Sequence, residues 1–511
     1  MLQLRTPSEA AKWLHARVKG MLQTDSRKVA AGDGFIAWPG AATDGRRFVS
    51  GALAQGASAC LVEAEGVESW NFEREDVAAY PQLKEASGPI AAVYYEEPSR
   101  QMGVIAVTGT NGKTSTSWWL AQALSALPKP VAIPCGLVGT LGVGRVPHPG
   151  ADTSAPAQVV STGLTTPDPV LLQQTLRRFV DEGLQACAME ASSIGIEQRR
   201  LDGTQIRTAI FTNFTQDHLD YHGTMQAYWK AKAALFDWPG LTSAVVNVDD
   251  DKGAELAATL SGRPLDLWTV SCKKAARLQA RDIHVDARGL RFAVCEGAEQ
   301  RELSTQLIGS YNVSNLLGVI GAMRSLGVTL EQAVSVCHEL APVPGRMDCQ
   351  TEEGQPMVVV DYAHTPDALA KALEALRPVA QQRDGRLWCV FGCGGDRDAS
   401  KRPAMGAVAA QYADEVVVTS DNPRSEKPQT IISQILLGLE GCTHVSVEPD
   451  RARAIDQALQ QAGANDVLLV AGKGHEDYQE INGVRVPFSD RDQVHQAMQA
   501  RAAARAVGGA G

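Results

Sequence analysis

Short apolar runs alternate with amphipathic stretches along most of the chain, and this alternation sets the expected architecture. Apolar runs typical of buried strands stand at residues 104–107, 186–189, 209–211, 357–360 and 387–391. The stretches between them carry apolar residues at helical spacing. Alternating strands and helices predict an α/β fold whose central sheet is mostly parallel, with helices on both faces.

Two breaks in this pattern divide the chain into three expected domains. Proline and charge interrupt it at residues 96–100, and prolines with a glycine interrupt it again at residues 341–346. We therefore expect domains at residues 1–99, 100–340 and 341–498. An alanine- and glycine-rich tail at residues 499–511 is expected to be disordered.

The first hundred residues mix short strands and helices, and polar loops lie between them. Ser26, and the loop at residues 40–47 with Thr43 and two arginines, are suited to grip a polar or phosphorylated group. A solvated surface turn explains the same residues equally well. Residues 67–90 are polar, and we expect them to be irregular.

The most informative stretch is Gly-Thr-Asn-Gly-Lys-Thr-Ser at residues 109–115, between an apolar strand and a helix. Backbone N–H groups and the positive end of a helix dipole bind phosphate at such a turn. Lys113 can reach terminal phosphates, and the Thr114 hydroxyl can bind magnesium. The standard phosphate-loop spacing would need glycine where Val107 stands, so the loop is a shortened variant; the alternative is an ordinary Gly-Asn turn.

Polar clusters follow several of the expected strands at their carboxyl ends, where parallel sheets bind ligands. They stand at residues 190–193, 212–222 and 247–251, which suggests one convergent site. Glu190 directly follows an apolar strand, where a carboxylate is costly unless it is paired or bound to metal. His218 is a second candidate ligand or a capping residue. Composition alone makes Lys230 and Lys232 solvated surface lysines.

Composition and charge exclude several classes of function. The chain of 511 residues is 44% hydrophobic and 21% charged, as globular proteins are, and is too long for one core. Its net charge of −10 argues against non-specific binding of nucleic acid. No apolar run reaches the roughly 18 residues of a membrane span, and no signal peptide is evident. Ten scattered cysteines without zinc-finger spacing favour reduced thiols and a cytoplasmic location.

Several motifs occur in an order that resembles the Mur ligases, the ATP-dependent amide-forming enzymes of peptidoglycan synthesis. They are the phosphate loop at 109–115, Met-Glu-Ala-Ser-Ser at 189–193, Thr-Asn-Phe-Thr-Gln-Asp-His-Leu-Asp at 212–220, Pro-Gly-Arg at 344–346 and Asp-Tyr-Ala-His at 361–364. Asp-Asn-Pro-Arg at 421–424 and Gly-Lys-Gly-His-Glu at 472–476 resemble the members that add meso-2,6-diaminopimelate. The resemblance extends from about Asp25 to Asp490.

The resemblance implies three domains: the first for the UDP part of the substrate, the second for ATP, and a Rossmann-like third for the amino acid. The implied reaction joins meso-diaminopimelate to the D-glutamate carboxylate of UDP-N-acetylmuramoyl-L-alanyl-D-glutamate. ATP phosphorylates that carboxylate, and the amine then attacks the acyl phosphate. The implied protein is a cytoplasmic ligase, expected to be a monomer, that serves cell-wall synthesis, cell shape and cell division.

The resemblance also assigns the residues around ATP and Mg²⁺. Thr114 and Glu190 would hold one magnesium ion, and His218 with a carbamylated Lys232 would hold a second. Lys230 is the alternative to Lys232 if the register is shifted. Nucleotide-binding positions are implied for Gly109, Thr110, Asn111, Gly112, Lys113, Thr114, Ser115, Asn312, Arg346, Asp361 and His364.

Two further groups of positions match the substrates. Those that resemble the contacts of the UDP-sugar peptide are Ser26, Thr165, Thr166, Ser192, Gln198 and Arg200. Those that resemble the diaminopimelate pocket are Arg397, Asp421, Asn422, Pro423, Arg424, Gly472 and Glu476. An arginine paired with a carboxylate suits the distal ammonium and carboxylate of this amino acid. The chain departs from many relatives at Ile194, where they carry histidine.

Three alternatives remain open on the sequence. In an L-lysine-adding enzyme Arg424 would have no substrate carboxylate to bind, since lysine has no distal carboxylate. Another Mur or folylpolyglutamate-type ligase would not need the motif at 421–424. A nucleotide-hydrolysing switch with a phosphate loop would turn ATP over without an amino acid, and would leave the polar strand ends of the third domain unexplained.

Overall fold

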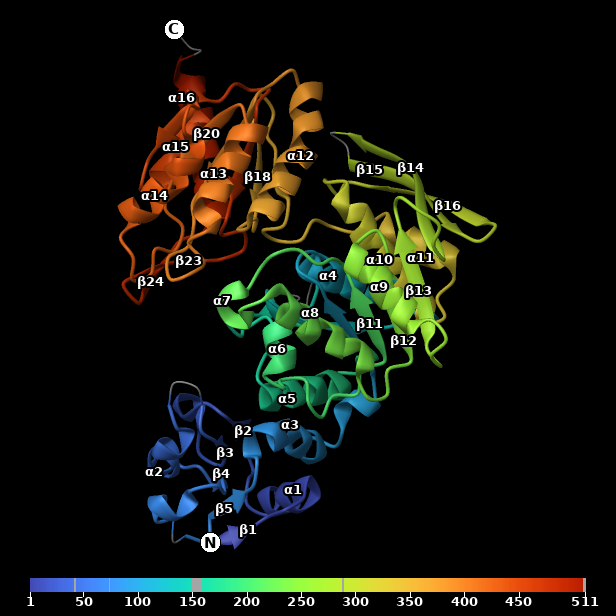
Figure 1. Ribbon diagram of the computed structural model, residues 1–511, viewed down its shortest axis with the longest axis vertical. Coiled ribbons are helices and arrows are strands. Elements are labelled where there is room, and N and C mark those ends of the chain that lie inside the picture. Colours follow the sequence, from blue (N-terminus) through green and yellow to red (C-terminus); the bar gives the residue numbers. More distant parts are fainter. Residues whose placement is uncertain (41–42, 73, 149–158, 287–288, 509–511) are drawn as a thin grey trace.

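The computed structural model describes residues 1–511 apart from 41–42, 73, 149–158, 287–288 and 509–511 (Figure 1). Three sheets follow one another along its long axis, with the N-terminal sheet at the bottom of Figure 1 and the C-terminal sheet at the top. The predicted α/β class is confirmed, and each sheet lies within one of the three segments expected from the sequence.

The N-terminal segment contains β1 (Leu2–Gln3), α1 (Pro7–His15), β2 (Leu22–Gln23), β3 (Gly34–Ala37), α2 (Val49–Ala54), β4 (Ala59–Glu63), β5 (Val77–Tyr80) and α3 (Leu83–Tyr94). The strand order is β1-β5-β4-β3-β2, and all pairs are parallel. Because side chains alternate along a strand, Ile36 packs with α1 and α3 on one face while Phe35 packs with α2 on the other.

Residues 67–90 are not irregular, contrary to the expectation from their polarity. Strand β5 is buried along its whole length between β1 and β4. Helix α3 follows, although Gln82 before it has a left-handed backbone and Pro89 lies inside it. Tertiary packing stabilises this helix, because Gly88 lies closely against the central segment. A Cβ on Gly88 would lie 2.1 Å from the carbonyl oxygen of Asp202.

The central segment contains β6 (Gly103–Thr108), α4 (Lys113–Ala126), β7 (Cys135–Gly139), β8 (Gly142–Arg145), β9 (Val159–Val160), α5 (Pro169–Asp181), β10 (Ala186–Glu190), α6 (Ser193–Glu197), β11 (Thr208–Phe211), α7 (Leu219–His222), α8 (Met225–Ala233), β12 (Ser243–Asn247), α9 (Asp251–Leu260), β13 (Asp266–Ser271), β14 (Leu278–Asp286), β15 (Gly289–Glu296), β16 (Glu299–Thr305), α10 (Tyr311–Ser325) and α11 (Leu330–Cys337). The strand order is β16-β15-β14-β13-β12-β11-β6-β10-β7-β8-β9. The strands from β14 to β7 pair in parallel and the two ends are antiparallel, so β6 and its phosphate loop lie inside the parallel part.

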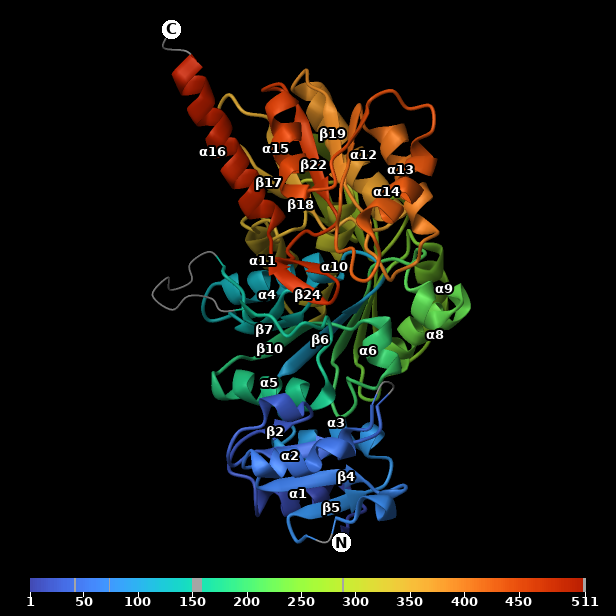
Figure 2. The ribbon, with the colours of Figure 1, turned by 90° about the vertical axis from the view of Figure 1, so that its left-hand side faces the viewer.

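The C-terminal segment contains β17 (Asp348–Gln350), β18 (Met357–Asp361), α12 (Pro366–Gln382), β19 (Leu387–Phe391), α13 (Lys401–Tyr412), β20 (Glu415–Val418), α14 (Pro428–Leu436), β21 (Val445–Val447), α15 (Arg451–Gln461), β22 (Val467–Ala471), β23 (Tyr478–Ile481), β24 (Val484–Pro487) and α16 (Asp490–Gly508). The order β17-β18-β22-β19-β20-β21 is parallel except at β17, and β23 with β24 forms a separate hairpin. Helices α12 and α13 pack on one face and α15 and α16 on the other (Figure 2).

The expected disordered tail from residue 499 is wrong up to residue 508, because α16 continues to Gly508. Arg501 explains the continuation, since its buried guanidinium donates to the carbonyls of Leu459 and Ala462 at the end of α15. Within the described residues, no helix is both long and apolar enough to cross a membrane. All ten cysteines are free thiols.

Candidate active site

The phosphate loop joins β6 to α4, and two glycines give it its shape. Gly109 has φ of 147° and Gly112 has φ of 85°, a backbone region that favours glycine. A Cβ on Gly109 would lie 1.9 Å from Thr212 Oγ1, so this position has no room for a side chain. The Lys113 ammonium folds back over the loop and donates to the carbonyls of Gly109 at 2.9 Å and Thr110 at 2.8 Å.

The segment after β11 holds the loop from the other side. The amides of Thr110 and Asn111 donate to the backbone oxygen and the side-chain oxygen of Asn213. Thr212 Oγ1 donates to the Asn111 carbonyl at 2.6 Å. The polar cluster at residues 212–222 and the phosphate loop therefore form one unit, as the sequence predicts for adjacent strand ends.

Glu190 ends β10 with an exposed fraction of only 1%, and hydrogen bonds compensate its burial. Its carboxylate accepts from Thr114 Oγ1 at 3.0 Å, the Thr140 amide at 2.7 Å and Thr140 Oγ1 at 3.1 Å. Thr114 lies in the first turn of α4, so this carboxylate borders the phosphate loop. The hydroxyl oxygen of Thr114 and the carboxylate oxygens of Glu190 are ligands of the type that magnesium prefers.

Arg346 reaches the same point from the start of the C-terminal segment. Its Nη2 donates to Thr114 Oγ1 at 3.1 Å, and its guanidinium lies 4.5 Å from the ring centre of Tyr362. The Nε of Arg346 is buried and has no hydrogen-bond partner among the described residues. Asp361 is buried nearby, and burial raises the pKa of its carboxyl although Arg346 opposes the shift.

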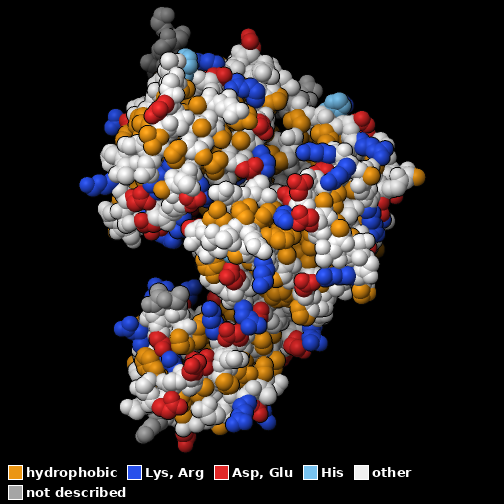
Figure 3. All heavy atoms as spheres, in the orientation of Figure 1, with side chains coloured by type: hydrophobic (Ala, Val, Ile, Leu, Met, Phe, Trp, Pro, Cys, Tyr) orange, Lys and Arg blue, Asp and Glu red, His pale blue; other side chains and the backbone are white. Residues whose placement is uncertain are grey.

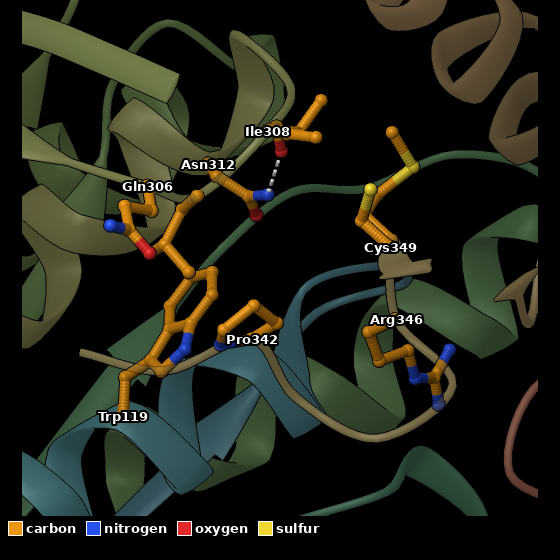
Figure 4. Close-up of a pocket in the computed structure, with 9 residues that line it drawn as sticks. Trp119, Gln306, Ile308, Asn312, Pro342, Arg346 and Cys349 are labelled. Atoms are coloured by element: carbon orange, nitrogen blue, oxygen red, sulfur yellow. Dashed lines mark hydrogen bonds between the residues drawn. The ribbon is translucent and has the colours of Figure 1, made fainter. Parts of the chain in front are cut away.

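A pocket opens beside Arg346 at the junction of the central and C-terminal segments (Figure 4). In the close-up the indole ring of Trp119 lies beside Pro342, and the side-chain amide of Asn312 points toward the carbonyl of Ile308. Asn312 Nδ2 donates to the Ile308 carbonyl at 2.7 Å, which fixes the amide orientation. The pocket thus combines one aromatic face with a polar amide. His364, the last nucleotide position predicted, is exposed, and its Nδ1 donates to the carbonyl of Tyr362 instead.

Lys232 is not a surface lysine, contrary to the expectation from composition. Its side chain is buried to an exposed fraction of 1%, donates to the Gly109 carbonyl at 2.6 Å and lies 4.4 Å from the ring centre of Tyr228. Burial, and then the nearby charge of Lys113, lower the pKa of the Lys232 ammonium well below its ordinary value. Lys230 is exposed, as expected from composition.

His218 precedes α7 and has a left-handed backbone, but its side chain does not cap that helix. Its Nε2 lies 3.4 Å from Asp217 Oδ2, and burial lowers its pKa to about 4 although Asp217 opposes the shift. Asp217 also accepts from Lys401 Nζ of the C-terminal segment at 2.7 Å. Burial raises the pKa of the Asp217 carboxyl, but the charges of His364, His218 and Lys401 outweigh it and lower the pKa overall.

Five of the six residues matched to the UDP-substrate lie together beside Glu190. Thr166 Oγ1 donates to the Glu190 carbonyl at 2.8 Å and lies 3.0 Å from Ser192 Oγ. Arg200 Nη1 donates to the Thr166 carbonyl at 2.8 Å, and Arg200 also binds the side-chain oxygen of Gln198. The Oγ1 of the fifth residue, Thr165, lies 3.0 Å from Thr140 Oγ1.

The sixth, Ser26, lies in the N-terminal segment on a short 3-10 turn, Ser26–Lys28. None of its described contacts reaches the other five residues. Figure 3 shows the surface hollowed between the N-terminal lobe and the lobe above it. The residue roles of the UDP-substrate group stay a prediction.

The residues matched to the diaminopimelate pocket come from three strand ends of the C-terminal sheet. Asn422 Nδ2 donates to Glu476 Oε2 at 2.8 Å. Lys473, with no exposed surface, donates to the side-chain oxygens of Asn422 at 3.0 Å and Glu476 at 2.9 Å. Asp421 lies against Gly472, where a Cβ would meet its Oδ2 at 2.6 Å.

Arg424 closes this cluster with a left-handed backbone, φ 51°. Its amide donates to the Glu480 carbonyl, and its Nη1 donates to the Gly395 carbonyl at 2.8 Å. Its Nε lies 3.8 Å from the Glu480 carboxylate. Pro423 packs its carbonyl against Gly395, whereas Arg397 is exposed and donates to the Asp396 carbonyl.

Sequence reasoning missed four residues of these clusters: Thr140, Asp217, Tyr228 and Lys473. Asp217 and Lys473 stand inside quoted motifs, so their charge was a usable signal. Thr140 and Tyr228 carry no local signal, because their partners Glu190 and Thr110 are far away in the chain.

Within the described residues, no three or more His, Cys, Asp or Glu side chains gather as a metal-binding group.

Models of three protein domains match the chain. The Mur ligase family catalytic domain matches residues 20–95, the Mur ligase middle domain matches 107–323, and the Mur ligase glutamate ligase domain matches 345–474. The matched ranges fall in the N-terminal, central and C-terminal segments respectively.

Curated relatives match over almost the whole chain. The UDP-N-acetylmuramoyl-L-alanyl-D-glutamate–2,6-diaminopimelate ligase of Acidovorax sp. (strain JS42) is 60% identical over 501 residues, 98% of this chain and 98% of that protein. The enzyme of the same name from Janthinobacterium sp. (strain Marseille) is 48% identical over 96% of each chain.

Solved structures of Mur ligases are similar to this chain over most of its length. A UDP-N-acetylmuramoyl-L-alanyl-D-glutamate–2,6-diaminopimelate ligase is 35% identical, with a TM-score of 0.63 over 94% of this chain and 95% of that chain. MurF ligase from Thermotoga maritima in complex with ADP, at 17% identity, has a TM-score of 0.65 over 96% and 99% and shares the fold.

Proposed function

The chain belongs to the Mur ligase family, and from this premise we propose the reaction that it catalyses. It is an ATP-dependent ligase that joins meso-2,6-diaminopimelate to the D-glutamate carboxylate of UDP-N-acetylmuramoyl-L-alanyl-D-glutamate, in peptidoglycan synthesis. Its relatives at up to 60% identity over 98% of the chain carry this activity in their names.

One observation carries the proposal: a hydrogen-bonded path joins the phosphate loop to the residues matched to the UDP-substrate and to Arg346 of the C-terminal segment. Thr114 accepts from Arg346 of the C-terminal segment and donates to Glu190. Glu190 in turn accepts from Thr166, whose carbonyl binds Arg200. A phosphate donor on the loop would therefore lie next to an acceptor held by Thr166 and Arg200, as transfer between them requires.

ATP supplies the phosphoryl group, and the loop residues 109–115 are proposed to hold its phosphates. Lys113 would leave the carbonyls of Gly109 and Thr110 and neutralise the terminal phosphates. The pocket of Trp119 and Asn312 is suited to the base, with Arg346 nearby, and Asp361 and His364 complete the proposed nucleotide positions.

Magnesium, when bound, would neutralise phosphate charge during the transfer. Thr114 and Glu190 fit one ion, because their oxygens lie 3.0 Å apart at the loop. His218 and Lys232 are the proposed protein ligands of a second. The lowered pKa of Lys232 favours its neutral amine, whose nitrogen can attack CO₂ and lose a proton to give a carbamate, in which two oxygens share one negative charge. That modification is part of the proposal.

The chemistry then has two steps. A carboxylate oxygen of D-glutamate attacks the γ-phosphorus of ATP, and ADP leaves with the electrons of the broken P–O bond. The neutral amine of diaminopimelate attacks the resulting acyl carbon, the C–O bond to phosphate breaks, and the amine proton passes to solvent or base. Preorganised cations account for most of such catalysis, because the transferring group carries the charge.

We propose that Arg397, Asp421, Asn422, Pro423, Arg424, Gly472 and Glu476 hold the amino acid, and that Ser26, Thr165, Thr166, Ser192, Gln198 and Arg200 hold the UDP-dipeptide. We also propose that the enzyme is a cytoplasmic monomer and that its product supports cell shape and division. Ile194 replaces a histidine of many relatives, so no substrate contact is assigned to that position.

The deciding experiment measures ADP release with the UDP-dipeptide and, in turn, meso-diaminopimelate or L-lysine. We expect turnover that requires the dipeptide and prefers meso-diaminopimelate. Turnover without the dipeptide would indicate a nucleotide switch, and a preference for lysine would indicate the lysine-adding activity. Either result would overturn the proposed function.

A further inference from the structure

A fully buried ion pair lies behind the amino-acid cluster and belongs to no group assigned so far. Arg451 is the first residue of α15 and Asp490 the first of α16, and neither side chain has exposed surface. Arg451 Nε donates to Asp490 Oδ1 at 2.7 Å, and its Nη2 donates to Oδ2 at 2.8 Å. This bidentate geometry is the strongest form of such a pair.

The same guanidinium binds two strand ends. Its Nη1 donates to the Ser420 carbonyl at 3.2 Å, and its Nη2 donates to the Ala471 carbonyl at 2.9 Å. The next residues in the chain are Asp421 and Gly472, two of the positions proposed to hold the amino acid. Arg451 therefore contacts the backbone immediately behind the pocket at two places.

The sheet itself does not join these two strand ends. In the order β18-β22-β19-β20, strand β19 separates β22, which ends at Ala471, from β20, which leads to Ser420. Backbone hydrogen bonds pair β20 with β19 and β22 with β19, but they do not pair β20 with β22. Arg451 spans this gap and links the two ends directly.

The loops that follow these strands lie close together. A Cβ on Gly472 would lie 2.6 Å from Asp421 Oδ2, and a Cβ on Gly392, at the end of β19, would lie 2.4 Å from the Thr419 carbonyl. Glycine at both positions therefore lets these loops lie close together. Loss of the arginine link would allow the ends of β22 and β20 to separate and would widen the pocket wall.

Helix stability does not explain an arginine at this position. The first turn of a helix carries the positive end of the dipole and favours acidic residues, as Asp490 at the start of α16 illustrates. Arg451 stands at the unfavourable end of α15. Burying an ion pair also gains little stability over apolar side chains of similar size.

We propose that Arg451 is a positioning residue of the amino-acid pocket, which fixes the separation of Asp421 and Gly472 and thereby the preference for meso-diaminopimelate over lysine. This rests on the proposed function. Asp490 holds the guanidinium in the orientation that reaches both carbonyls.

The test compares the double variant Arg451→Met with Asp490→Leu against the wild type and against Arg501→Met. The double variant removes both buried charges together, so no unpaired charge opposes folding. Arg501 is a matched control, because it is a buried arginine that binds carbonyls at the opposite end of α15. The measurements are KM for meso-diaminopimelate and for ATP, and the ratio of kcat/KM between meso-diaminopimelate and L-lysine.

In the double variant we expect KM for meso-diaminopimelate to rise by about tenfold or more and the selectivity ratio to fall, because small displacements of binding groups have effects of that order. KM for ATP should stay within about twofold, and Arg501→Met should leave both constants near wild type. Equal changes in both constants, or a folded double variant with unchanged amino-acid kinetics, would overturn the proposal.

The single variant Asp490→Asn keeps the inference testable if the double variant does not fold, since it retains one oxygen acceptor and removes the charge. Its KM for meso-diaminopimelate should rise in the same direction, and an unchanged value would count against the proposal. Wild-type protein that releases ADP independently of meso-diaminopimelate would contradict the proposed function instead, so the two failures are distinguishable.

Discussion

Single residues connect distant segments at this site, and Thr114 is the central one. Its hydroxyl lies between Glu190 and Arg346, which are 76 and 232 residues away in the chain. A hydroxyl can accept from the guanidinium while it donates to the carboxylate, and no apolar side chain of this size can do both. One side chain thus connects the phosphate loop to the buried Glu190 carboxylate and to Arg346 of the C-terminal segment.

Lys232 should be far more important than Lys230, although both lie on α8. We expect Lys232→Met to lower kcat by at least about a hundredfold, because it removes a group of the proposed metal site. Lys230→Met, at an exposed position of the same helix, should leave kcat within about twofold of wild type. Steady-state ADP release measures both. Added bicarbonate should raise wild-type activity after CO₂ removal, and a bicarbonate-independent enzyme would contradict the carbamate.

His475 should make stability depend on pH. Burial lowers its pKa to about 3, so the folded protein disfavours the charged form, whereas the unfolded chain protonates near pH 6.5. Stability is therefore complete above about pH 6.5 and is lost as the pH falls, by roughly 2 kcal/mol at pH 5. Thermal unfolding at both pH values should show a smaller loss in His475→Gln than in the exposed control His444→Gln. Equal losses would contradict this assignment.

At the scale of elements, the phosphate loop was predictable because its signals are local. Glycines, lysine and threonine lie within seven consecutive residues, 109–115, between a strand and a helix that the apolar pattern also indicates. The burial of Lys232 was not predictable, because its partner Gly109 is 123 residues away and α8 shows no clear apolar face. Likewise α3 forms although Gly88 and Pro89 stand in its middle, and the packing of Gly88 on the central segment accounts for this.

The left-handed glycine at the start of α4 gives a prediction about this element. A Cβ on Gly112 would lie 2.4 Å from Asn315 Oδ1, and its φ of 85° adds backbone strain. We expect Gly112→Ala to raise KM for ATP by about tenfold or more, since strain and displacement together amount to roughly 1–3 kcal/mol.

Gly327→Ala is the matched control for this change, because Gly327 has a similar φ of 90° with no atom within 4 Å of an added Cβ. Gly327→Ala therefore adds the backbone strain without the steric clash that Gly112→Ala also introduces. If both variants bind ATP as wild type does, the loop tolerates a side chain and its proposed role in phosphate binding is wrong.

At the scale of the whole molecule, two polar contacts besides that of Arg346 with Thr114 join the C-terminal segment to the central one at the phosphate site. Lys401 at the start of α13 binds Asp217, and Asp367 at the start of α12 accepts from Asn111 at 3.1 Å. The sequence gives no indication of either pairing, since 184 and 256 residues separate the partners. The relative placement of the segments depends on such long-range contacts. The α/β fold of each segment, in contrast, follows from its own pattern of apolar and polar residues.

Lys401→Met should weaken this junction. It leaves Asp217 buried without its lysine, which costs about 3–5 kcal/mol for a buried pair. We expect kcat to fall by about tenfold or more and the radius of gyration in solution scattering to rise, because the C-terminal segment loses a contact that holds it at the site. Lys427→Met, an exposed lysine of the same segment, should change neither. An unchanged kcat with normal scattering would show that the pair does not hold the segments together.

The indole of Trp119 gives the molecule an optical property of its own. Its Nε1 donates at 3.0 Å to the carbonyl of Ala341, where the chain passes from the central to the C-terminal segment, and its exposed fraction is only 2%. The emission wavelength of an indole depends on its hydrogen bond and on the polarity around it. Rotation of the C-terminal segment about this point would therefore shift the intrinsic fluorescence of the protein, and the shift, absent in Trp119→Phe, would report domain movement without any attached label.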